Sequence, residues 1–228
     1  MTVHKLLKLL TWPSRLALIF ILPSTFLRAS EPLLKITFAE AEPQALIPSV
    51  KDKAGNASDF FRRTDGTDLR ISGIQNPFKK CSGFFFAAQD LDGLVKGKAL
   101  QTLTSNKIAL KGATSLDFAV KAAEFGDGWD RTDFVTFNLE FTGGGKETKR
   151  VLNFRKLNDG KTHNSSAALV LQGDLGSPGQ EVTETFGQFR ALGILVPQGA
   201  REVRLIVTFQ LNSEGESFAI DDLTLTKS

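Results

Sequence analysis

Short stretches rich in carboxylates are the parts of this 228-residue chain best suited to do chemistry. Four such groupings occur: Asp90-Leu-Asp-Gly93, Asp127-Gly-Trp-Asp-Arg-Thr-Asp133, Asn158-Asp-Gly160 and Glu214-Gly-Glu-Ser-Phe-Ala-Ile-Asp-Asp222. Asp, Asn and Gly are also common turn formers, and we interpret Asn158-Asp-Gly160 as a turn. The other three groupings could bind a divalent cation or supply the acids of a hydrolase.

The last grouping differs from the others because its acids interrupt an apolar strand. Phe218 and Ile220 share one side of such a strand, whereas Leu223 and Leu225 share the other side. The alternation therefore changes phase at Asp221-Asp222, which is the effect of a β-bulge. A bulge frees backbone carbonyl groups and redirects carboxylates, and oxygen ligands of this kind suit Ca²⁺.

We therefore predict a structural Ca²⁺ ion at Asp221, because an isolated buried carboxylate is costly unless it is paired or bound to a metal. The other expected oxygen donors are Asp222, Glu216, Asp90 and an acid of the first strand, either Glu40 or Glu42. The alternative is an exposed edge strand, where two solvated acids discourage pairing with a neighbouring chain.

A hydrolytic function depends on whether two acids can converge. Glycoside hydrolysis needs two carboxyl groups held roughly 5 to 9.5 Å apart. The best strand pattern, Val135–Phe141, carries one acid, and the chain contains no E-x-D-x-x-E motif. It also has no Tyr, the residue on which jelly-roll polysaccharide lyases commonly rely. A polysaccharide-active enzyme would use acids near this strand, of which we consider four first: Asp127, Asp130, Asp133 and Glu140.

Histidine and cysteine are too scarce to build other common sites. Beyond residue 30 the chain has one His, His163, and one Cys, Cys81. They are too few for a transition-metal centre, and the loop-like sequence around His163 lacks the G-x-S-x-G turn of many serine hydrolases. We expect His163 at the surface and Cys81 buried as a small apolar residue.

The charge of the chain gives no reason to expect a polyanionic partner. The formal charge is +3, but residues 1–30 hold four basic residues and no acid, which leaves 24 Lys and Arg against 25 Asp and Glu. A remainder so close to neutral does not favour nucleic acid or an anionic membrane as partner.

Residues 1–30 predict a secretory signal peptide. A leader with three basic residues precedes the apolar stretch Leu16–Leu22, which is too short to span a bilayer, and Ala29-Ser30 offers small residues for cleavage. We expect a mature chain that is secreted to the periplasm or beyond the cell and keeps no stable membrane span.

The rest of the chain predicts strands and almost no helix. Val135–Phe141 and Val203–Leu211 alternate apolar and polar residues, as half-buried strands do. Further strands are predicted at Leu34–Phe38, Gly83–Ala88, Asn106–Leu110, Ser115–Ala122, Arg150–Arg155, Ala167–Leu171, Glu181–Phe189 and Ser217–Thr226. Gly-rich turns such as Gly143–Gly145 separate several of them. We predict an all-β fold, an antiparallel two-layer β-sandwich (jelly roll), as one domain over residues 31–228.

Several segments together resemble secreted bacterial β-sandwich modules of the galactose-binding-like and MAM-like jelly-roll families. The resemblance is carried by Gly83–Gly93, Leu116–Phe118, Gly128–Val135 and Glu216–Leu225. The last strand in these families often reads apolar-Asp-Asp/Asn-apolar. The resemblance implies a non-catalytic module that binds glycans or extracellular proteins, with a structural Ca²⁺ ligated by Asp221. We expect Trp129 to stack on a sugar ring.

Three functions follow from these patterns. The leading one is a secreted, non-catalytic binding or adhesion module, with carbohydrate as the first ligand to consider. The alternatives are a polysaccharide-active enzyme on the same fold and a structural component of an extracellular matrix. An enzyme needs a cleft with two convergent acids, a lectin needs an exposed aromatic platform, and a matrix protein needs neither.

Overall fold

The computed structural model describes residues 31–39, 46–52, 57–126, 128–156, 169–172 and 179–228. Its elements are β1 (Leu34–Ile36), β2 (Leu46–Pro48), β3 (Phe60–Thr64), β4 (Arg70–Ile71), β5 (Ile74–Gln75), β6 (Phe85–Gln89), α1 (Leu91–Leu94), β7 (Leu100–Ser105), β8 (Ile108–Ala109), β9 (Ser115–Gly126), β10 (Phe134–Thr142), β11 (Glu147–Lys156), β12 (Leu169–Gln172), β13 (Gly187–Leu195), β14 (Glu202–Gln210) and β15 (Glu216–Lys227). The helix is a single turn, so the described chain is almost entirely β-structure.

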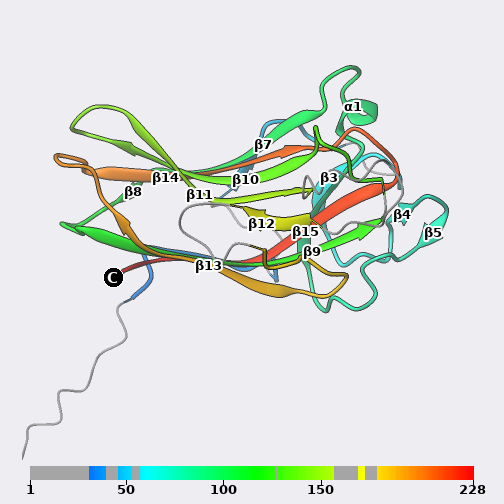
Figure 1. The fold of residues 1–228 in the computed structure, drawn as a ribbon, viewed down its shortest axis with the longest axis horizontal. Helices are drawn as coiled ribbons and strands as arrows, with labels where there is room; N and C mark the ends of the chain where they lie inside the picture. The colour runs from blue at the N-terminus through cyan, green and yellow to red at the C-terminus, as the bar shows by residue number, and fades with distance from the viewer. Residues whose placement is uncertain (1–30, 40–45, 53–56, 127, 157–168, 173–178) are drawn as a thin grey trace, which may run out of the picture.

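Two antiparallel sheets form the layers seen in Figure 1. The six-stranded sheet has the order β13-β9-β15-β6-β3, and β1 pairs with the far half of β15. The seven-stranded sheet has the order β12-β11-β10-β14-β7-β2, and β8 pairs with the start of β14. The strands β4 and β5 form a separate hairpin. The predicted all-β sandwich is confirmed.

The space between the two sheets is filled by apolar side chains that alternate along each strand. In β14 every second residue, from Val203 to Phe209, is buried in this main core. Phe154 of β11 meets Phe189 of β13 edge to face, with ring centroids 4.9 Å apart. Alternation in the sequence predicts these strands because one face of each must leave water.

A second core covers the outer face of the six-stranded sheet. Residues 65–84 cross this face, and buried Phe78 and Cys81 of this segment pack with Phe60 and Phe85 of the sheet. We call this segment the strap and the sheet surface under it the covered face. Burial raises the pKa of the Cys81 thiol to about 11, so it is an unreactive apolar group, as the sequence predicts.

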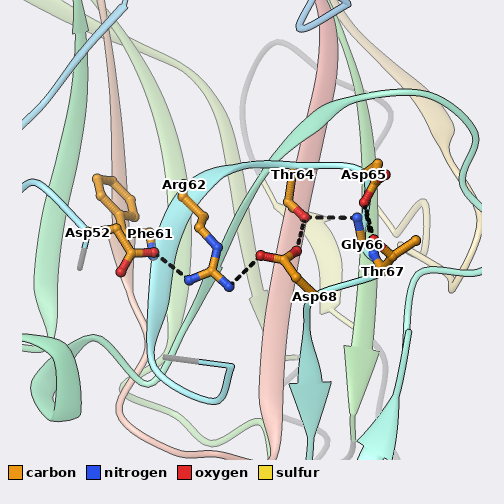
Figure 2. Close-up of polar contacts among 8 residues, drawn as sticks. All are labelled: Asp52, Phe61, Arg62, Thr64, Asp65, Gly66, Thr67 and Asp68. Carbon is orange, nitrogen blue, oxygen red and sulfur yellow. Dashed lines mark hydrogen bonds and ion pairs between the residues drawn. The ribbon is translucent and has the colours of Figure 1, made fainter. Parts of the chain in front are cut away.

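Polar contacts fasten the start of the strap to β3, as Figure 2 shows. The Arg62 guanidinium lies between two carboxylates, 2.9 Å from Asp52 and 2.8 Å from Asp68. The Thr64 hydroxyl donates to Asp68 and accepts the backbone N–H of Gly66 at 2.8 Å. Since Asp52 is nearly enclosed, Arg62 neutralises a charge that would otherwise be costly to bury.

Two β-bulges flank β9, one on each of its neighbouring strands. The pairing of β15 with β9 shifts register between Asp221 and Thr224, and Asp222 there has a left-handed backbone with φ of 48°. This confirms the bulge predicted from the change of phase. The pairing of β13 with β9 also shifts, between Ala191 and Ile194.

The second bulge explains an error in the sequence interpretation. A strand is predicted over Glu181–Phe189, but β13 spans Gly187–Leu195. The bulge interrupts the alternation after Ala191, so the true strand lacks a regular period of two.

Two other strands escape sequence reasoning for different physical reasons. In β3 both Phe60 and Phe61 are buried, because the strand has one core on each side. In β7 the inward residues include Gln101 and Ser105, whose polar groups are satisfied locally: the Ser105 hydroxyl accepts the Leu205 N–H at 2.9 Å. Neither strand therefore shows the usual pattern.

The predicted signal peptide lies outside the described residues. Within the described ranges, no helix has the length and apolar character needed to cross a bilayer.

Candidate functional site

The outer face of the seven-stranded sheet carries a continuous array of polar side chains. Because Val135, Phe137, Leu139 and Phe141 of β10 point into the main core, the residues between them point outward. The pairings of β10 with β11 and β14, and of β14 with β7, align these outward residues in rows. We call this surface the polar face.

The rows cross the sheet at right angles to the strands. Their members are Arg155, Phe134, Gln210 and Leu100 in the first row; Asn153, Thr136, Thr208 and Thr102 in the second; Arg150, Asn138, Ile206 and Thr104 in the third; and Thr148, Glu140 and Arg204 in the fourth. Hydroxyl, amide and guanidinium groups predominate, so the face can both donate and accept hydrogen bonds over several strands.

The centre of the polar face is partly enclosed. Thr136 is 5% exposed and Asn153 is 8% exposed, although both side chains point away from the main core. The side-chain amide of Asn138 donates to the Thr136 hydroxyl at 3.2 Å. The Asn153 Oδ1 atom has no hydrogen-bond partner among the described residues. The accessible polar groups at the centre of the face are therefore those of Asn138, Thr208 and Arg150.

An ion-pair network occupies one end of the polar face. Glu140 lies 2.8 Å from Lys146 Nζ and 2.7 Å from Arg204 Nε. The hydrogen bond from Lys146, reinforced by Arg204, lowers the pKa of Glu140, so this carboxylate stays ionised. One carboxylate between two cations leaves the network with a net positive charge.

A stacked guanidinium occupies the other end. The Arg155 guanidinium carbon lies 4.9 Å from the centre of the Phe134 ring, a cation–π arrangement. Arg155 has no ion pair among the described residues. The ring therefore orients the guanidinium, and no described carboxylate forms an ion pair with it.

Trp129, the predicted sugar-stacking residue, lies inside the protein. Its side chain is 2% exposed and belongs to the main core, while Lys156 Nζ donates to its backbone carbonyl at 2.7 Å. An indole in this position presents no ring face to a ligand. Its loop, rich in Asp and Gly, resembles an exposed turn in sequence, which is why the burial is not predicted.

Of the four acids considered for catalysis, the three that the structure describes do not converge on an accessible cleft. Asp127 lies outside the described residues. Asp133 precedes β10 and Glu140 lies seven residues further along, a separation of about 23 Å at the rise of an extended strand. Asp130, whose N–H donates to Asp133, has a lowered pKa from its hydrogen bonds to Thr132, which outweigh burial. Glu140 is thus farther from Asp133 than the roughly 5 to 9.5 Å that a glycosidase needs.

Asp133 does approach one other acid, Glu216, but both are 0% exposed. Burial and the hydrogen bond between the two carboxyl groups raise the pKa of Glu216 to about 10, and burial also raises the pKa of Asp133, so the pair keeps a proton at neutral pH. The Asn212 N–H donates to Glu216 at 2.6 Å. A substrate in solvent does not reach this pair, so we regard it as structural.

The predicted calcium ligands lie at separate places. Asp222 forms an ion pair with Lys121, and Asp221 accepts the Phe38 N–H at 3.4 Å. Burial raises the pKa of Asp221. Glu40 and Glu42 lie outside the described residues. The described residues at the bulge thus supply two neighbouring carboxylates, of which Asp222 is paired with a lysine, and these are not a calcium ligand set on their own.

Asp90 belongs to a different acidic group, together with Asp59 and Glu214. One carboxylate oxygen of each lies within 4.8 Å of the others. Burial, helped by neighbouring Asp92, raises the pKa of Asp90 to about 7. Asp90 and Glu216 therefore do not join Asp221 in one site, because they lie at the opposite end of β15 from its bulge.

A depression of about 520 Å³ lies between two turns, the one that joins β10 to β11 and the one that joins β13 to β14. Its walls are the 143–147 turn and the 195–200 segment, with Leu195 and Pro197 among its apolar residues. The two turns approach closely: a Cβ atom on Gly144 would lie 2.7 Å from the Gly199 carbonyl carbon. The lining of this depression also includes the charged side chains Lys146, Glu147 and Lys149. The polar face is the better candidate site because it presents aligned hydrogen-bonding groups over four strands.

No family model matches this chain, and no curated protein matches it either. Solved structures give the comparisons that do match, and they are mainly carbohydrate-binding modules.

Three of these structures show the level of similarity. A xylan-binding domain of carbohydrate-binding module family 22 is 10% identical, with a TM-score of 0.47 over 88% of this chain and 96% of its own. Carbohydrate-binding module 61 in complex with β-1,4-galactotriose is 13% identical, with a TM-score of 0.45 over 87% and 100%. The N-terminal modules of Clostridium thermocellum xylanase 10B, in complex with xylohexaose, are 11% identical, with a TM-score of 0.46 over 87% of this chain and 29% of theirs.

These neighbours are modules of the kind that the sequence resembles, and the likeness concerns the fold alone. The chain spans less than a third of the xylanase structure. Every TM-score is below 0.5, so the ligands of these modules are not assigned to this chain on likeness.

Proposed function

We propose that this protein is a secreted, non-catalytic module that binds carbohydrate on its polar face. The observation that carries the proposal is the set of aligned rows of hydroxyl, amide and guanidinium groups across β7, β14, β10 and β11. Sugar hydroxyl groups both donate and accept hydrogen bonds, and a rigid array that does the same is complementary to them.

The chemistry of the face favours a carbohydrate over a protein ligand. The centre of a protein–protein interface is usually apolar and aromatic. On the polar face the central rows hold Thr136, Asn138, Asn153 and Thr208, with Ile206 as the apolar exception. This composition supports a hydrated, hydrogen-bonded ligand.

The geometry of the acids supports a non-catalytic function. Glu140 is held ionised by Lys146 and Arg204, so it is poorly suited to act as a general acid. Asp133 lies about 23 Å away along the strand, and its neighbour Glu216 is inaccessible.

Secretion and calcium binding remain separate parts of the proposal. Secretion rests on the leader in residues 1–30, and amino-terminal sequencing of the exported protein should begin near Ser30 or Glu31. For calcium, chelation should lower the melting temperature and added Ca²⁺ should restore it, with the response lost in Asp221→Ala. An unchanged melting temperature would contradict calcium binding and favour the alternative, in which Asp221 and Asp222 bind no metal.

A glycan microarray, combined with a reducing-sugar assay on the polysaccharides that bind, tests the function. We expect binding without release of reducing ends, and weaker binding after Asn138→Ala or Thr208→Ala. Release of reducing ends by the purified protein would show an enzyme, and absence of binding to every glycan would favour the matrix function.

A further inference from the structure

The charges of the polar face are unbalanced. Among the described residues, five cations and two carboxylates lie on it or at its edge, namely Lys107, Lys146, Arg150, Arg155, Arg204, Glu140 and Glu202. This local excess of positive charge contrasts with the near-neutral composition of the chain beyond residue 30.

Ion pairs account for three of the five cations. Lys107 lies 3.0 Å from Glu202, and Glu140 contacts both Lys146 and Arg204. The remaining two, Arg150 and Arg155, have no carboxylate partner among the described residues. Both belong to β11 and point to the same side of the sheet, because Arg150 pairs with Asn138 and Arg155 with Phe134.

The position of Arg155 favours recognition of a fixed anion. Stacking on Phe134 restricts the guanidinium, which reduces the conformational entropy lost when a ligand binds. The planar guanidinium can donate two parallel hydrogen bonds to a carboxylate or a sulfate group. The next row, about 6.6 Å along the strands, offers the partly exposed hydroxyl groups of Thr208 and Thr102 to the same sugar chain.

We propose that the polar face binds carbohydrate chains that carry negative charge, with Arg155 and Arg150 contacting the acidic groups. This inference rests on the proposed function and specifies the class of glycan. A carboxylate of a uronic acid and a sulfate ester present the same chemistry to a guanidinium group, so both are included. A neutral glycan would leave the two arginines uncompensated.

Isothermal titration calorimetry with four polysaccharides tests the proposal. The probes are polygalacturonate for carboxylate, carrageenan for sulfate, and neutral xylan and galactan. We expect the full chain to bind at least one acidic probe more tightly than both neutral ones, with an affinity that falls as salt is raised. Preference for polygalacturonate or for carrageenan identifies the acidic group.

Substitution separates a specific site from general charge attraction. Arg155→Gln should weaken binding to the preferred acidic probe about tenfold, and Arg150→Gln should weaken it less, because Arg150 lacks the stacking ring. The matched control is Arg190→Gln on β13, which removes the same charge from an exposed position on the other sheet. The melting temperature of each variant verifies folding.

Three results would overturn the inference. Equal loss in Arg190→Gln and Arg155→Gln would indicate unspecific attraction. Preference for a neutral probe with no dependence on salt would refute the acidic ligand and leave the proposed carbohydrate function intact. Failure to bind all four probes, together with a negative glycan microarray, would refute both the acidic ligand and the proposed carbohydrate function.

Discussion

The two outer faces of the sandwich are built from similar antiparallel strands but carry opposite chemistry. Across the covered face runs a row of alanines, Ala87, Ala219 and Ala123, each fully buried. Across the polar face runs a row of Asn153, Thr136, Thr208 and Thr102. The small alanine side chains let the strap approach the six-stranded sheet closely. The hydrogen-bonding side chains of the seven-stranded sheet instead suit a bound ligand.

This difference teaches how the chain divides stability and binding between its layers. The covered face adds a second core with three edge-to-face contacts, among them Phe78 against Phe85 at 5.4 Å. Buried aromatic rings of this kind contribute strongly to stability. The polar face buries fewer apolar groups, and substitutions there should affect binding more than folding.

The largest expected effect comes from emptying the second core. Phe85→Ala should destabilise the fold by about 3–5 kcal/mol, because it removes a fully buried ring beneath the strap. Urea denaturation measures the loss. The neighbouring Phe84, which is 39% exposed, provides the control, and Phe84→Ala should cost about 1 kcal/mol or less. Equal costs would show that the strap does not form a core.

A smaller loss should follow removal of the arginine that fastens the strap. Arg62→Ala leaves the nearly enclosed Asp52 without its cation and should cost about 2–3 kcal/mol. The comparison is Lys107→Ala, which breaks an exposed pair with Glu202 and should cost less than about 1 kcal/mol. Differential scanning calorimetry compares the two variants. Similar melting temperatures would contradict the claim that Arg62 neutralises a buried charge.

Glu124, a buried acid of β9, should make stability depend on pH. Burial raises its pKa to about 8, although its carboxylate accepts the Leu169 N–H at 3.0 Å. The folded chain therefore keeps a proton that the unfolded chain loses near pH 4.5, so stability is full below that pH and falls as the pH rises through 8. Glu124→Gln should flatten this decline and raise the melting temperature at pH 8 by several degrees. If the stability of the variant depends on pH as that of the natural chain does, a group other than Glu124 causes the decline.

The smallest effect should come from Glu140 on the polar face, with the opposite sign. Its cations lower its pKa, so the stability it contributes is present above its usual pKa of 4.5 and is lost as the pH falls through the lowered value. Glu140→Gln should therefore cost about 1 kcal/mol or less at pH 7 and reduce the loss of stability in acid. A stabilised variant at pH 7 would contradict this assignment.

Much of the fold could be predicted because its strands leave local traces. The alternation of Val203–Leu211 predicts β14, and the change of phase at Asp221-Asp222 predicts the bulge of β15. β3 has no alternation of apolar and polar residues, because the strap buries the side of the strand that faces away from the main core. Its two consecutive phenylalanines therefore resemble a short apolar run and do not predict a strand. The strap itself is a tertiary feature without a local period.

The candidate site could be predicted only in part. The predicted strand Arg150–Arg155 contains both arginines of the polar face, but their neighbours depend on pairing with β10 and on the bulge between Phe137 and Asn138. The sequence predicts that Trp129 stacks on sugar, because an exposed aromatic ring can do so, yet this side chain is buried in the main core. Burial of a loop residue depends on contacts distant in sequence.

A crystal structure of the protein with an acidic oligosaccharide, such as a trimer of galacturonic acid, tests the central claim most directly. The account predicts that the sugar lies across β10, β11 and β14 on the polar face, with an acidic group against the Arg155 guanidinium. An oligosaccharide found instead in the depression between the 143–147 turn and the 195–200 segment, with the polar face vacant, would contradict it.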